Sequence, residues 1–368
     1  MNFSFKNICS LIVCIFASIS FLLGQTSSQT DLKWYDAREF TVEGKGWKDT
    51  ALFYDRLPAR AEKLVRPEVW RLSQNSAGIS VRFVTDAETI SVRWKLRSPN
   101  LALPNMTAIA VSGIDLYVKE KKAWFWAASG RAAQPSVNEQ KIISNMTRRR
   151  REFLLYLPLY NGVDSVEIGI PTNAFASAAQ SYPKNIKPIV VYGTSIVQGA
   201  SASRAGLAYP SILSRKLNRP AINLGFSGNG KMEAEIAELL AEIDAAVFII
   251  DCLPNLSNGA EVAERTPKLI EILRKRRPTT PIVLIENLKY PDVFIENRKN
   301  RIYREKNAAL KQVYNRLVRT GVKKIYYISG DNLIGNDTEG TIDGVHPIDI
   351  GFFRMTSVIE QTLKRFIN

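Results

Sequence analysis

The chain has 368 residues, a hydrophobic content of 45% and a formal net charge of +15 at pH 7. This length is sufficient for two domains, each with its own core. The sequence contains one histidine and three cysteines, so a zinc site is not expected. It has no P-loop or Rossmann glycine fingerprint, and nothing in it predicts a metal or a cofactor.

The positive charge is gathered in clusters. Such clusters attract nucleic acids, anionic glycans or acidic membrane surfaces, but they are more often the solvated faces of helices and loops. No zinc-finger, helix-turn-helix or RNA-binding signature accompanies them, so nucleic acid is not predicted as a partner. The clusters are Arg148–Arg151, Arg274–Arg277 and Arg298–Lys306.

Residues 1–24 are typical of a secretory signal peptide. Lys6 is the only charged residue before Asp31, and the apolar run Leu11–Leu23 is too short and too poorly flanked for a membrane span. We expect cleavage near Gly24 and a secreted or periplasmic location; an uncleaved membrane anchor is the alternative. After cleavage Cys252 is the only cysteine, which excludes an intramolecular disulfide.

Residues 25–180 are predicted to form an all-β sandwich. Apolar and polar residues alternate with a period of two in residues 77–85, 88–96, 107–118, 151–160 and 163–170. The segment Thr172–Asn185 is rich in Ala, Ser, Asn and Pro and is interpreted as a linker. Every tryptophan of the chain precedes it, and tryptophans in a sandwich are usually core residues.

Residues 186–368 change to an alternation of strands and helices. This pattern predicts a parallel sheet with helices on both faces. The expected strands are 188–192, 221–226, 245–252, 281–286 and 323–329, and the expected helices are 209–217, 232–243, 262–276, 300–320 and 352–366.

Polar residues follow several of these strands. Ser195 lies directly after the first strand, where open α/β sheets bind their ligands; the alternative is a serine that caps the next helix. The only histidine, His346, precedes the last helix, with Asp343 three residues before it. A serine nucleophile needs a base and a carboxylate that orients the base. The N–H of Gly228 and the amide of Asn255 follow the next two strands and are suitable oxyanion donors.

The order of these residues resembles the SGNH, or GDSL-type, hydrolases, and the resemblance covers residues 187–368. It implies Ser195 as nucleophile, His346 as base and Asp343 as its partner, with Gly228 and Asn255 joining the Ser195 N–H as oxyanion donors. Two departures indicate a divergent branch: Thr194 stands where the family often has Asp, and Pro254–Asn255–Leu256 replaces Gly-x-Asn-Asp.

That branch carries an N-terminal β domain with a G-x-D-L-Y motif, which is Gly113–Tyr117 here. The resemblance implies a carboxylic ester hydrolase. We therefore expect an exported esterase that deacetylates an acylated saccharide through an acyl-enzyme on Ser195. The alternatives are an acyltransferase that uses the same acyl-enzyme and a glycan-binding protein with an inactive hydrolase domain. The acyl group, the alcohol and the oligomeric state stay open.

The β domain also supplies candidate substrate-binding residues. Trp124 and Trp126 are two residues apart, so in a strand they share one face. The charged K-E-K-K run before them predicts a solvent-exposed position. With Asp115 and Tyr117 of the G-x-D-L-Y motif, they are expected to form a wall of the active-site cleft; the alternative is that both tryptophans are core.

Overall fold

A computed structural model describes residues 31–367, and from Leu32 onward the chain forms one compact unit. The predicted signal peptide lies outside the described residues. Among residues 31–367, none of the helices combines the length and the apolar character that crossing a bilayer requires.

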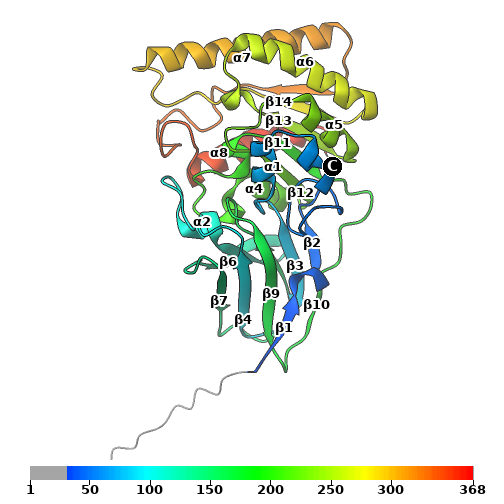
Figure 1. The fold of residues 1–368 in the computed structure, drawn as a ribbon, viewed down its shortest axis with the longest axis vertical. Helices are drawn as coiled ribbons and strands as arrows, with labels where there is room; N and C mark the ends of the chain where they lie inside the picture. The colour runs from blue at the N-terminus through cyan, green and yellow to red at the C-terminus, as the bar shows by residue number, and fades with distance from the viewer. Residues whose placement is uncertain (1–30, 368) are drawn as a thin grey trace, which may run out of the picture. The chain divides into compact units, whose positions relative to one another are not determined.

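The first half of the unit contains two antiparallel sheets whose inner faces share one core (Figure 1). Trp94 and Phe153 are buried between them, as the period-two alternation predicts. One sheet has the order β1 (Leu32–Asp36), β9 (Val163–Pro171), β4 (Ile90–Leu96) and β7 (Val137–Ile143). The other has the order β10 (Ala176–Ala178), β3 (Ser80–Thr85), β8 (Arg151–Tyr156), β5 (Ile114–Glu120) and β6 (Ala123–Gly130), with β2 (Thr41–Glu43) also paired to β3.

The structure corrects two local predictions. Part of the predicted linker is strand β10, which pairs with β3. Part of the alternating run 107–118 is helix α2 (Ala108–Ser112), because neighbouring segments bind its carbonyl groups: the Ser112 carbonyl accepts a hydrogen bond from the Trp94 indole at 3.0 Å. Tertiary contacts thus override the local pattern. The remaining short helices of this half are η1 (Ala37–Glu39), η2 (Ala59–Lys63) and α1 (Pro67–Ser73).

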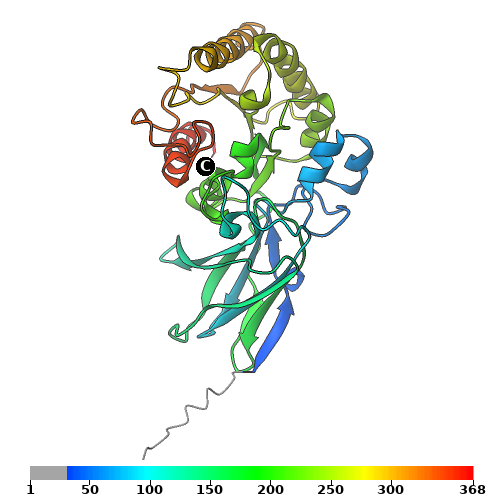
Figure 2. The ribbon, with the colours of Figure 1, turned by 60° about the vertical axis from the view of Figure 1, so that its left-hand side comes forward.

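The second half is a parallel sheet between two layers of helices, as predicted (Figure 2). Alternate residues of β11 enter different cores: Val191 packs with α4 and α8, whereas Val190 packs with α5 and α6. The strand order is β12 (Ala221–Gly225), β11 (Ile189–Gly193), β13 (Val247–Asp251), β14 (Ile282–Ile285) and β15 (Ile325–Ile328). The helices are α3 (Ser195–Gln198), η3 (Ala205–Leu207), α4 (Tyr209–Lys216), α5 (Ala234–Glu242), η4 (Leu253–Asn255), α6 (Gly259–Arg276), α7 (Asn297–Arg319) and α8 (Asp349–Leu363).

The two halves share one hydrophobic core. Val111, Tyr156 and Leu159 of the β domain belong to the same buried cluster as Ile196 and Ile212 of the α/β domain. Burial of apolar surface therefore stabilises the contact between the domains as well as the packing within each of them.

Asp251 is a buried acid at the end of β13, and its carboxylate accepts a hydrogen bond from the Tyr209 hydroxyl at 3.0 Å. Burial raises the pKa of Asp251 to about 7. An aspartate in an unfolded chain has a pKa of about 3.9. Between these two values the folded chain holds a proton that the unfolded chain has released, so this group's contribution to the free energy of unfolding falls as pH rises.

We predict that Asp251→Asn stabilises the protein above neutral pH. Asparagine still accepts the Tyr209 hydrogen bond but does not ionise, so the free energy of unfolding should increase by about 1–3 kcal/mol at pH 8. The gain should shrink toward pH 4.5, where the folded aspartate is protonated. Thermal melts of both proteins across this range test the prediction, and a gain that does not change with pH would contradict it.

Candidate active site

Ser195 is the first residue of helix α3, directly after strand β11, and it is 7% exposed. Thr194 caps this helix, since its hydroxyl accepts the Ile196 N–H at 3.2 Å. The capping role considered for Ser195 therefore belongs to its neighbour. Gly193 lets the chain pass close to β13, because a Cβ there would lie 2.2 Å from the Asp251 carbonyl oxygen.

The structure brings Ser195, His346 and Asp343 together in a line. The distance from Ser195 Oγ to His346 Nε2 is 2.9 Å, and that from His346 Nδ1 to Asp343 Oδ2 is 2.7 Å. Because the carboxylate accepts the proton on Nδ1, Nε2 is left as the acceptor that faces the serine hydroxyl. This is the hydrogen-bond pattern of a serine–histidine–aspartate triad.

Asp343 also shapes the loop that carries the histidine. Its Oδ1 accepts the backbone N–H groups of His346 at 2.8 Å and Val345 at 3.0 Å. Burial acts to raise the pKa of Asp343, but these hydrogen bonds and the His346 ring outweigh it and hold the pKa below its usual value. The aspartate is therefore ionised near neutral pH, as an orienting group for a base must be.

Three N–H donors come from the carboxyl ends of neighbouring strands. The N–H of Ser195 has no partner within α3, since it belongs to the first turn. The N–H of Gly228 donates no hydrogen bond within residues 31–367. The Oδ1 of Asn255 accepts the Gly230 N–H at 3.2 Å, so its Nδ2 points elsewhere and has no partner in the described part of the chain. The strands before these residues pair in register with β11.

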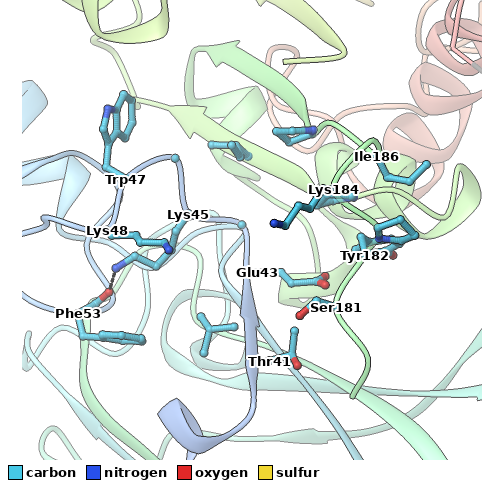
Figure 3. Close-up of a pocket in the computed structure, with 17 residues that line it drawn as sticks. Thr41, Glu43, Lys45, Trp47, Lys48, Phe53, Ser181, Tyr182, Lys184 and Ile186 are labelled. Atoms are coloured by element: carbon cyan, nitrogen blue, oxygen red, sulfur yellow. Dashed lines mark hydrogen bonds between the residues drawn. The ribbon is translucent and has the colours of Figure 1, made fainter. Parts of the chain in front are cut away.

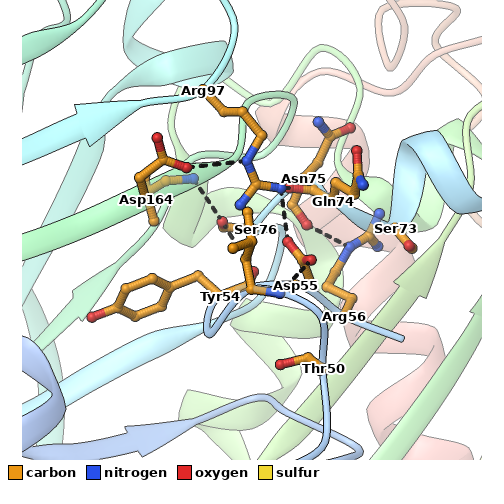
Figure 4. A network of polar contacts seen from close by, with 12 residues as sticks. Thr50, Tyr54, Asp55, Arg56, Ser73, Gln74, Asn75, Ser76, Arg97 and Asp164 are labelled. Carbon is orange, nitrogen blue, oxygen red and sulfur yellow. Dashed lines mark hydrogen bonds and ion pairs between the residues drawn. The ribbon is translucent and has the colours of Figure 1, made fainter. Parts of the chain in front are cut away.

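Arg56 of the β domain, which the sequence does not mark, supports the Gly228 loop. Figure 4 shows it beside Asn75, one of its hydrogen-bond partners. Arg56 is 1% exposed, and burial lowers its pKa to about 9. Its Nη1 donates to the carbonyl oxygens of Asn223 at 3.1 Å and Gly225 at 2.8 Å, at the end of β12. Its Nε donates to the Asn75 carbonyl oxygen at 2.8 Å. One guanidinium thus joins a β-domain loop to the strand that leads to Gly228.

Gln198, the last residue of α3, makes a second link to the same loop. Its Oε1 accepts the Ser227 N–H at 3.0 Å, and its Nε2 donates to Asn75 Oδ1 and to the Leu159 carbonyl oxygen, both at 3.1 Å. The segments that carry Ser195 and Gly228 are therefore held at fixed separation by side-chain hydrogen bonds. A single polar residue in a sequence gives no signal for such a link.

A pocket of about 480 Å³ lies beside this site, although Ser195, His346 and Asp343 do not line it. Its lining includes Ser227, the residue before Gly228, and Tyr160, whose hydroxyl donates to the Ser195 carbonyl oxygen at 3.4 Å. Arg97, Ser98 and Asn100 of the β domain also line it. The wall that the β domain gives to this pocket comes from these loops and not from the G-x-D-L-Y motif.

Asp115 and Tyr117 of the motif lie in the contact between the domains. Asp115 is 0% exposed, and its carboxylate accepts hydrogen bonds from Arg204 Nη1 at 2.8 Å and the Gly206 N–H at 2.9 Å. The Tyr117 hydroxyl accepts from the same Arg204 nitrogen at 2.5 Å. A substrate cannot reach the Asp115 carboxylate, which corrects its expected role, whereas Tyr117 lines the pocket that contains Trp124 and Trp126. Both side chains bind Arg204, which lies between α3 and α4.

Trp124 and Trp126 line a different pocket, which contains none of the three residues in the hydrogen-bonded line. Trp126 is 53% exposed and Trp124 is half-buried, so neither is an ordinary core residue. Figure 3 shows another pocket, of about 610 Å³. It is lined by Pro188 and Pro220, directly before β11 and β12, so it lies at the amino ends of these strands, whereas Ser195 follows the carboxyl end of β11. Residues 31–367 contain no group of three side chains suited to hold a metal ion.

Two sequence profiles match the chain. The profile of the GDSL-like Lipase/Acylhydrolase family matches residues 186–364. The profile described as the N-terminus of Esterase_SGNH_hydro-type matches residues 32–175. A search of curated protein sequences gives no match.

Solved structures share the whole architecture. The salicylyl-acyltransferase SsfX3 from a tetracycline biosynthetic pathway is 15% identical with a TM-score of 0.73, covering 91% of this chain and 97% of its own. A family two carbohydrate esterase from Cellvibrio japonicus is 13% identical with a TM-score of 0.58, covering 92% and 98%. These two establish the fold alone. A protein from Bacteroides ovatus ATCC 8483 described as a GDSL-like lipase is 38% identical with a TM-score of 0.86, covering 91% and 98%. That identity, together with both profiles, confirms the family predicted from the motifs: the chain belongs to the SGNH, or GDSL-like, lipase/acylhydrolase family and carries a GxDLY-type N-terminal domain.

Proposed function

We propose that the protein is an exported serine esterase that removes a short acyl group from a saccharide through an acyl-enzyme on Ser195. The observation that carries the proposal is the hydrogen-bonded line from Ser195 Oγ through His346 to Asp343. Export is supported by the signal-like residues 1–24.

The geometry accounts for both halves of the reaction. As Ser195 Oγ attacks the ester carbonyl carbon, its proton passes to His346 Nε2, and the carbonyl oxygen becomes an oxyanion bound by the N–H groups of Ser195 and Gly228 and the amide of Asn255. His346 then protonates the departing alcohol oxygen. In the second half the same nitrogen takes a proton from water, whose oxygen attacks the acyl carbon. The bond from that carbon to Ser195 Oγ then breaks, Oγ takes the proton back from His346 Nε2, and the acid is released.

The lining of the 480 Å³ pocket beside Ser195 favours a substrate whose alcohol part is polar. Arg97, Ser98 and Asn100 offer hydrogen-bond donors and acceptors to hydroxyl groups, whereas a long acyl chain requires an extended apolar channel. The family two carbohydrate esterases share this fold. The acyltransferase SsfX3 shares it too, so an alcohol in place of water is the second candidate acceptor.

Acetate release from acetylated xylan and acetylated cello-oligosaccharides, with p-nitrophenyl acetate as the minimal substrate, tests the proposal. We expect turnover of both the minimal and the saccharide esters. A product that forms only when an acceptor alcohol is added would replace hydrolysis with transfer. If no ester is turned over, the remaining interpretation is a glycan-binding protein with an inactive hydrolase domain.

We predict that His346→Ala lowers kcat on p-nitrophenyl acetate by about 10³-fold or more, since the chain contains no other histidine that could replace the base. The melting temperature should change little, because the ring is partly exposed and contacts mainly the other two residues of the line. A His346→Ala protein that is folded and retains wild-type turnover would exclude this residue as the base.

Cys252 provides the matched control. It is 0% exposed, its thiol lies 3.8 Å from the Tyr192 carbonyl oxygen, and burial raises its pKa well above the usual value, so it is not a thiolate nucleophile. Cys252→Ala should keep kcat within about two-fold of wild type and cost about 1 kcal/mol of stability for the small cavity. A large loss of turnover with an unchanged melting curve would assign the thiol a catalytic role.

A further inference from the structure

A groove of about 460 Å³ lies between the edge strand β6 and helix α4. Trp124 and Trp126 of β6 line one side of it, and Arg215 and Lys216 of α4 line the other. The groove is therefore built by both domains. It contains none of the proposed catalytic residues, so its occupant is a separate question from the ester chemistry.

The indole ring of Trp126 is held in place although it is exposed. Its Nε1 donates to Asp115 Oδ1 at 3.0 Å, and the Arg204 guanidinium lies 5.2 Å from the ring centroid. The side chain is still 53% exposed, and its neighbour Phe125, which also lines the groove, is 54% exposed. A fixed ring loses little entropy on binding and offers a flat surface to the C–H face of a sugar.

Positive charge surrounds these rings. Arg204 is paired with Asp115, and Lys216 is paired with Glu360. Lys122 and Arg215 have no carboxylate partner within residues 31–367. The Arg215 guanidinium lies 4.0 Å from the Tyr117 ring centroid and donates to the Ser211 carbonyl oxygen at 3.2 Å, so its charge is held at the groove but is not neutralised by an anion of the described chain. The four cationic residues of the groove are Lys122, Arg204, Arg215 and Lys216.

We propose that this groove binds an acidic saccharide, a chain whose sugar rings stack on the β6 aromatics while its uronate carboxylates pair with the cations around them. Aromatic rings alone would suit a neutral glycan as well. The charges of Lys122 and Arg215, which no carboxylate of residues 31–367 neutralises, favour the acidic one, because a cation without an anionic partner gains most from an anionic ligand. The concave shape and the fixed ring favour a sugar chain over a flat lipid surface.

The test is binding of oligogalacturonates to the full chain carrying Ser195→Ala, measured by isothermal titration calorimetry, with neutral cello-oligosaccharides of the same length beside them. We expect the acidic chain to bind at least ten-fold more tightly, with an affinity that falls as salt is added. Trp126→Ala and Lys122→Glu should each weaken its binding by five-fold or more. Lys122 is exposed and makes no hydrogen bond within the described chain, so its variant does not threaten folding.

Matched controls lie on β1, outside the groove. Trp34 also has an arginine over its ring, Arg93 at 4.1 Å, and Lys33 is an exposed lysine beside it. Trp34→Ala and Lys33→Glu should leave the affinity unchanged.

Equal affinity for acidic and neutral chains, no binding at millimolar concentration, or equal effects of groove and control variants would each overturn the proposal. Groove-dependent binding to anionic phospholipid vesicles without oligogalacturonate binding would overturn it in favour of a membrane surface. These readouts do not use ester turnover, so they stand whether or not the proposed esterase activity is found.

Discussion

A buried guanidinium, that of Arg56, is the constraint on which the arrangement of the site depends. Removing a charge from water costs several kcal/mol, and within residues 31–367 no carboxylate forms an ion pair with this one. The cost is offset because its donors meet carbonyl oxygens of both domains, including that of Leu72 at 2.6 Å, and because it lies 5.1 Å from the Phe226 ring centroid. Each such charged hydrogen bond contributes about 1.5–3 kcal/mol. The cation is therefore tolerated only while the two domains hold this one relative position.

A second buried ionisable group, Asp115, constrains the segment that follows Ser195 in the same way. Asp115 of the β domain is a buried acid, and its Oδ2 is satisfied when Arg204 and the Gly206 N–H approach it from the α/β domain. Arg56 thus fixes the loop that leads to Gly228, and Asp115 fixes the chain that follows Ser195. The second domain therefore contributes to the precision of the candidate site, and precision matters because donors displaced by about 1 Å lose most of their effect on a transition state.

Sequence patterns predicted the architecture because its periodicities are strong. Buried parallel strands and amphipathic helices can be recognised one segment at a time. These patterns placed Ser195 directly after a strand, and Asp343 and His346 in the loop before the last helix. Burial and long-range contacts could not be recognised in this way. The motif that contains Asp115 was assigned to the substrate because nothing local distinguishes a buried acid from an exposed one. Arg56 was not singled out, since all its acceptors are backbone carbonyls and two of them lie more than 160 residues away.

The two domains supply different parts of the candidate site. Ser195, His346, Asp343 and the candidate oxyanion donors all belong to the α/β domain, and Arg56 of the β domain holds the strand that leads to Gly228. The neighbouring pocket is lined by Arg97, Ser98 and Asn100 of β-domain loops. Arg97 is itself held by Asp55 at 2.8 Å and Asp164 at 3.2 Å (Figure 4). If the proposed esterase binds its alcohol in this pocket, changes in these loops should alter which alcohol fits while the hydrogen-bonded line from Ser195 to Asp343 keeps its geometry.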